Sequence, residues 1–165
     1  CSKPVIAAGR GYCFGVGFEI SLACDFRLAT PTTLYALPEQ KLGQIPGSGG
    51  SARLQKMVGI TRTKDIVMRS RRISGAQAYD WGVATECVPD NELEAATDAL
   101  VDELRGFSPL AQRTAKKLLN DTEDSLLSIA IELEGHCYSR LRSSNDFREG
   151  VEAFHDKRRA RFNGT

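Results

Sequence analysis

Two glutamates stand at places in the sequence that suit acid–base chemistry. Glu19 lies in GYCFGVGFEISLACD, after a strand-like run and alternating glycines, where the first turn of a helix is expected. Glu39 lies in LPEQKLGQIPGSGG, just before a loop rich in Gly and Pro. Two carboxyls in one partly dry cleft repel each other, so one can hold a proton while the other is ionised. The alternative is two ordinary solvated glutamates, because most glutamates are surface residues.

The glycines before Glu19 also have two interpretations. Gly15 and Gly17 allow the backbone to turn sharply from strand to helix. Alternatively, an N–H group near Val16 lies at a helix N-terminus, where it can stabilise negative charge developing on a substrate oxygen. A dinucleotide-binding fingerprint is excluded, because counting from Gly15 puts Ile20 at the third glycine position.

Residues 1–90 are predicted to form a mixed α/β region that positions these glutamates. We expect strands at 5–8, 12–14, 26–30, 32–38 and 83–89, and helices at 16–25, 48–59, 62–70 and 74–82. Ser74 is expected to cap the last helix and Gly82 to end it. Strand–helix–strand order predicts parallel strands whose carboxyl ends meet at one edge. Glu19 and Glu39 are therefore expected to face one cleft.

Residues 91–165 are predicted to be all helical. We expect helices at 91–107, 108–120 and 124–143, and a basic helix or tail at 145–162. Asn91 and Ser108 are the expected N-caps, with Pro109 at the first helical position. The apolar stripe from Leu126 to Leu141 and the helix from Leu93 to Phe107 together offer more apolar surface than a small helical lobe can hide. They predict packing against the core and other subunits, as a trimer or a dimer of trimers.

Composition narrows the function classes. The chain has 165 residues and a net charge of +1, which predicts no attraction to nucleic acid or to a membrane surface. Its apolar runs are far shorter than the ~20 residues that span a bilayer. Five irregularly spaced Cys, with no CxxC and no zinc-like His spacing, predict reduced thiols in an intracellular protein and no metal site. Aromatic residues are only 7% of the chain, which disfavours a glycosidase as the use of paired carboxylates.

A family resemblance lies in four stretches that keep their order and spacing: KPVIAAGRGYCFGVGFEISLACDFRLAT, LPEQKLGQIPGSGGSARLQKMVG, ISGAQAYDWGVATECVP and FREGVEAFHDKRRARF. Together they resemble the crotonase family, the enoyl-CoA hydratase/isomerase superfamily. The resemblance implies a spiral of ββα units followed by a helical C-terminal trimerisation region. It also implies that about the first third of the protein, with one oxyanion-hole amide and much of the CoA loop, is missing from this sequence.

The resemblance implies roles for three residues near the glycine-rich turn. Glu19 and Glu39 match the two catalytic glutamates, which hold a water and add it across the 2,3 double bond of an enoyl-CoA thioester. Val16 matches the glycine whose N–H completes the oxyanion hole. A backbone donor survives the change to valine, but the branched side chain adds bulk near the thioester. This departure leaves the exact reaction open.

The resemblance also implies a binding site for the CoA part of the substrate, with no separate cofactor. Tyr138, Phe154 and Lys157 match positions that contact CoA, often from a neighbouring subunit. The alternatives are core packing for the two aromatics and a solvated face for Lys157. Two alternative functions remain. One is another reaction of the family, such as double-bond isomerisation or C–C hydrolysis, and the other is a non-catalytic scaffold. The family implies a cytoplasmic location, or the mitochondrial matrix in a eukaryote.

Overall fold

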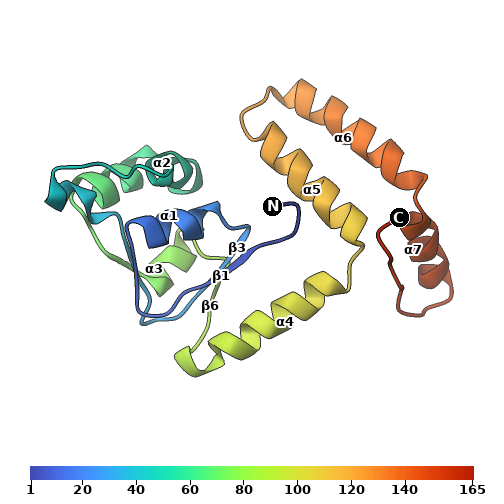
Figure 1. Ribbon diagram of the computed structural model, residues 1–165, viewed down its shortest axis with the longest axis horizontal. Helices are drawn as coiled ribbons and strands as arrows, with labels where there is room; N and C mark the ends of the chain where they lie inside the picture. The colour runs from blue at the N-terminus through green and yellow to red at the C-terminus, as the bar shows by residue number, and fades with distance from the viewer. The chain divides into compact units, whose positions relative to one another are not determined.

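The computed structural model describes residues 1–165, which form two compact units (Figure 1). The α/β unit comprises Val5–Ala99. The helical unit comprises Cys1–Pro4 together with Leu100–Thr165.

The α/β unit contains two three-stranded sheets. The first consists of β1 (Ile6–Ala8), β3 (Phe26–Ala29) and β6 (Glu86–Cys87), in the order β1-β3-β6 and all parallel. The second consists of β2 (Tyr12–Phe14), β4 (Leu34–Ala36) and β5 (Ile73–Ser74), in the order β2-β4-β5. Strands β2 and β4 are parallel, whereas β4 and β5 are antiparallel. The predicted parallel pairing is thus confirmed for β1–β3 and β2–β4.

Two predictions about strands need correction. The strand expected at 83–89 is reduced to the two residues of β6, because the N–H groups of Val83 and Ala84 bond to the Ala78 carbonyl and close the end of a helix instead. Strand β5 was not predicted. Its two residues carry no alternating pattern of their own, and they pair only because β4 lies beside them.

Three helices belong wholly to the α/β unit: α1 (Val16–Ala23), α2 (Gly50–Met68) and α3 (Gly75–Asp80). The two helices expected at 48–59 and 62–70 correspond to α2, which is kinked at Gly59, where φ is 78°. Ser74 caps α3 as predicted, because its side chain accepts from the Gln77 N–H and the Gln77 side chain accepts from the Ser74 N–H. A 3-10 helix, η1 (Pro38–Leu42), was not predicted.

The core of the α/β unit is formed by residues of both sheets and of helices α1, α2 and α3. The rings of Phe18 in α1 and Tyr35 in β4 pack with centroids 4.8 Å apart, and both side chains are fully buried. The other members of this core are Leu22, Ala29, Leu37, Leu54, Ile66, Ile73, Ala78, Val83 and Ala84. Each large apolar side chain buried here contributes about 1.5–3 kcal/mol to folding. Helix α1 is therefore held on the sheet by the residue next to Glu19.

Four helices follow: α4 (Leu93–Arg105), which begins in the α/β unit, then α5 (Pro109–Thr122), α6 (Leu127–Arg142) and α7 (Asn145–His155) in the helical unit. Helices α5 and α6 lie side by side (Figure 1). Ser108 caps α5 as predicted, since its Oγ accepts from the Ala111 N–H. The predicted Asn91 cap is wrong, because Asn91 lies inside a 3-10 helix, η2 (Asp90–Glu92), that runs directly into α4. No helix is long and apolar enough to cross a membrane.

The segment after α7 folds back on the helical unit through two carboxylates. Buried Asp146 accepts hydrogen bonds from the Ser108 hydroxyl and from the N–H groups of Asn163 and Gly164. Burial acts to raise the pKa of Asp146, but these bonds outweigh it and the pKa is lowered. Glu149 accepts two bonds from the Arg158 guanidinium, at 2.7 and 3.0 Å. Part of the basic tail is thus used in a structural ion pair.

This ion pair predicts how Glu149 contributes to stability as a function of pH. The Arg158 guanidinium and the Arg161 N–H hold the pKa of Glu149 at about 2, below the ~4.3 of an unfolded chain. Because the folded pKa is the lower one, the contribution is complete above about 4.3 and is lost as the pH falls towards 2. The Tm difference between the wild type and Glu149→Gln should therefore shrink across this window. A difference that stays constant from pH 6 to pH 2 would exclude this role.

Candidate active site

The candidate site lies at the carboxyl edge of the second sheet. Strands β2 and β4 end in register, with Phe14 paired to Ala36. The next residue, Gly15, donates its N–H to the Ala36 carbonyl at 3.0 Å. The start of α1, which carries Glu19, therefore lies beside the segment that leads into η1, which carries Glu39.

Glu19 is buried and held by backbone amides. Its side chain lies in the first turn of α1, and the residue is only 2% exposed. The Oε1 atom accepts from the N–H groups of Ser48, at 2.8 Å, and Gly50, at 3.0 Å. Because Gly50 begins α2, the carboxylate also meets the positive end of that helix. The alternative of an ordinary solvated glutamate is therefore excluded for Glu19.

Glu39 approaches the same turn from η1. A Cβ atom placed on Gly15 would lie 2.8 Å from Glu39 Oε1, so the carboxyl group packs directly against that glycine. Gly15 has φ 53° and ψ −125°, a conformation that side chains disfavour. The other oxygen, Glu39 Oε2, is buried and has no hydrogen-bond partner. A buried carboxyl oxygen without a partner is rare and needs an explanation, such as a catalytic role or a bound water.

Val16 occupies the first position of α1. Its N–H therefore has no acceptor within the helix. The valine side chain is 59% exposed, so it does not fill the core. The structure thus places a helix-terminal N–H one residue after the glycine that contacts Glu39.

Helix α1 is also anchored at its other end, by Arg27 from β3. The buried Arg27 guanidinium donates to the carbonyls of Ser21 and Cys24 at the end of α1, and to the carbonyl of Val83. A cation at this end of a helix is favourable. Sequence reasoning missed Arg27; the available signal was a charged residue within an otherwise apolar strand.

Comparisons with known proteins identify the family of this chain. The family model described as enoyl-CoA hydratase/isomerase matches residues 1–165. The chain belongs to the enoyl-CoA hydratase/isomerase family. It is 38% identical over 165 residues to a carnitinyl-CoA dehydratase of Salmonella typhimurium, covering 94% of this chain and 61% of that protein. It is 35% identical over 162 residues to an enoyl-CoA isomerase/hydratase of Mycosarcoma maydis, covering 98% of this chain and 59% of that protein.

A solved structure of this family shares the fold. The enoyl-CoA hydratase from Bacillus anthracis superposes with a TM-score of 0.97 at 34% identity, covering 99% of this chain and 64% of that one. The predicted resemblance to crotonases is confirmed. The chain spans 54–62% of the length of the family relatives that it matches.

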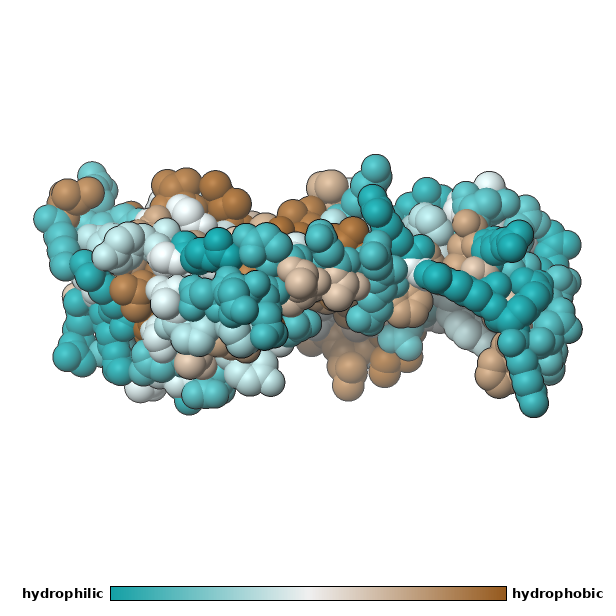
Figure 2. All heavy atoms as spheres, turned by 90° about the horizontal axis from the view of Figure 1, so that it is seen from below, coloured by the Kyte–Doolittle hydropathy of each residue, from teal (hydrophilic) through white to brown (hydrophobic).

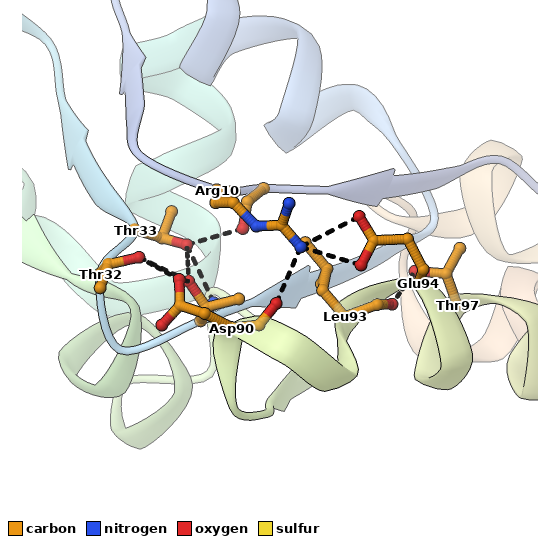
Figure 3. Close-up of polar contacts among 9 residues, drawn as sticks. Arg10, Thr32, Thr33, Asp90, Leu93, Glu94 and Thr97 are labelled. Carbon is orange, nitrogen blue, oxygen red and sulfur yellow. Dashed lines mark hydrogen bonds and ion pairs between the residues drawn. The ribbon is translucent and has the colours of Figure 1, made fainter.

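In this member of the enoyl-CoA hydratase/isomerase family, the carboxyl edge of the first sheet is occupied by a closed polar network (Figure 3). Arg10 donates to the Asp90 carbonyl at 2.8 Å and to both carboxylate oxygens of Glu94. Asp90 Oδ1 accepts from the hydroxyls of Thr30 and Thr32. Bonds from Thr32 and Thr30, together with Arg10, lower the pKa of Asp90. Because Arg10 is paired with Glu94 and the Asp90 carboxylate accepts from two hydroxyls, we place the candidate site at the other sheet edge.

The positions that the sequence resemblance assigned to CoA contacts lie in the helical unit. Tyr138 in α6 and Phe154 in α7 line one mostly apolar cavity of about 550 Å³. They are 58% and 81% exposed, so neither belongs to the core of this unit. The Arg142 guanidinium lies in the same cavity, 5.8 Å from the Tyr138 ring centroid. Lys157 is not among the lining residues and follows α7 with φ 53°.

Proposed function

We propose that the protein is an acyl-CoA hydratase that adds water across the 2,3 double bond of an enoyl-CoA thioester. The observation that carries this proposal is the pair of carboxyl groups at the start of α1. Glu19 is held by two amides, and Glu39 presents a buried oxygen without a partner. Such a pair can hold one water and exchange two protons with a substrate.

The geometry supports a division of labour between the two glutamates. The two amides occupy Glu19 Oε1 and suit its negative charge, which leaves Oε2 to accept a proton from the water. The water oxygen then bonds to C3 of the substrate. Glu39, whose Oε2 has no donor nearby, carries the proton that is transferred to C2. The net change in the substrate is H at C2 and OH at C3, and the proton on Glu19 returns through water to Glu39 to restore the starting state.

The thioester group of the substrate must be stabilised while water is added at C3. Addition at C3 moves negative charge onto the thioester oxygen, and hydrogen-bond donors aimed at that oxygen lower the barrier. We assign the Val16 N–H to this role, because it stands at the start of α1 with no acceptor in the helix. Valine at this position keeps the backbone N–H donor, but its branched side chain limits the space beside that donor.

Binding of the CoA moiety is assigned to the helical unit. An apolar cavity lined by Tyr138 and Phe154 suits the face of an adenine ring, and Arg142 adds a cation beside it. Lys157 is expected to meet phosphate oxygens. One relative is named a carnitinyl-CoA dehydratase. The name describes the removal of water from a CoA thioester, which supports the proposed hydratase reaction class.

The predicted trimer, or dimer of trimers, is also part of the proposal. Leu126, Leu127 and Ile131, at the start of α6, are 61–76% exposed. Figure 2 shows apolar patches between polar side chains on one face of the molecule. Apolar surface of this kind is typical of contacts between subunits. Sedimentation of the full protein as a monomer at micromolar concentration would contradict this assembly.

Double-bond isomerisation is the second candidate, because one relative is named an isomerase/hydratase. An assay of the full protein at the absorbance band of conjugated enoyl thioesters separates the two reactions. Hydration of crotonyl-CoA lowers this absorbance, whereas isomerisation of a 3-enoyl-CoA raises it. We expect the first change to be the faster one. A rise with the 3-enoyl substrate and no loss with crotonyl-CoA would favour the isomerase, and no change with either would favour a non-catalytic scaffold.

A further inference from the structure

Gly50 makes an unusually close approach to Glu19. A Cβ atom built on Gly50 would lie 2.7 Å from Cγ, 2.9 Å from Oε1 and 3.3 Å from Cδ of Glu19. Both residues are buried. A methyl group at this position must therefore displace Glu19.

The backbone of Gly50 does not itself require glycine. Unlike Gly49, which has φ 87°, Gly50 is outside the left-handed region. It is the first residue of α2, and alanine has a higher helix preference than glycine. The contact with Glu19 is therefore the feature that excludes a side chain.

We propose that Gly50 is a positioning residue for Glu19, an inference that rests on the proposed hydratase function. Its missing side chain lets the Glu19 carboxylate reach the amides of Ser48 and Gly50 together. These two bonds fix Oε1, and so decide where Oε2 meets the water. Moving the carboxylate by even part of an ångström disturbs a proton transfer that needs heavy-atom distances of about 2.6–3.2 Å.

The kinetic test is Gly50→Ala in the full protein, with Gly135→Ala as the matched control. Gly135 also lies within a helix, α6, but a Cβ there would meet nothing within 4 Å. Gly50→Ala should lower kcat for crotonyl-CoA at least about tenfold with KM within about twofold, and Gly135→Ala should leave both unchanged. In a Glu19→Gln background, adding Gly50→Ala should change kcat by less than about twofold, because it acts through Glu19. An equal kcat loss in both backgrounds would overturn the proposal.

A second readout does not depend on activity. Gly50→Ala should lower Tm in the wild type but raise it in a Glu19→Ala background, where the displaced atoms are gone and the helix preference for alanine remains. Equal Tm shifts in both backgrounds would show that a side chain at position 50 does not displace Glu19, and would overturn the proposal. If no variant hydrates an enoyl-CoA while the Tm cycle shows the expected reversal, the proposed function fails and the Gly50–Glu19 contact stands.

Discussion

Glu19→Gln is expected to lower kcat for an enoyl-CoA by about 10²–10⁴-fold while KM changes little. The glutamine carbonyl can accept the same Ser48 and Gly50 N–H groups that hold the carboxylate. The shape of the site should therefore survive, whereas the capacity to take a proton from water is lost.

The competing explanation for Glu19 is a helix-terminal charge with no catalytic role. A negative charge in the first turn of a helix is worth about 0.3–1 kcal/mol of stability. In that case Glu19→Gln would lower Tm slightly and leave kcat normal. Measuring both Tm and kcat on this one variant separates the two explanations, and a normal kcat would remove Glu19 from the mechanism.

Glu39→Gln is expected to cause a kcat loss of similar size, about 10²–10⁴-fold, because it removes the proton donor for C2. Since Glu39 Oε2 has no partner in the protein, this variant should change Tm little. The double variant with Glu19→Gln should lose far less than the product of the two single losses, because both groups act on one water. Losses that multiply fully would contradict a shared water.

The sequence predicted those parts of the site that depend on short-range signals. The strand-to-helix turn at Gly15, the caps at Ser74 and Ser108, and the parallel pairing of β2 with β4 all follow from local patterns or from chain order. That pairing alone brings the segment before Glu39 beside Gly15.

What sequence reasoning missed depends on contacts between distant residues. The amides that hold Glu19 come from Ser48 and Gly50, some thirty residues along the chain. No local sequence preference predicts a contact between residues so far apart. Arg27 is placed by carbonyls at the ends of two other segments. The 3-10 helix that presents Glu39 has weak local signals, since its residues also suit a loop.

The central claim is that water is added to an enoyl thioester, and isotope incorporation tests it most directly. The full protein would be incubated with crotonyl-CoA in water enriched in ¹⁸O, and the product would be analysed by mass spectrometry. Our account predicts a 3-hydroxyacyl-CoA with one ¹⁸O at C3, and a rate of labelling about 10²–10⁴-fold lower with the Glu19→Gln variant. A product without ¹⁸O, or an equal rate of labelling with the variant, would contradict it.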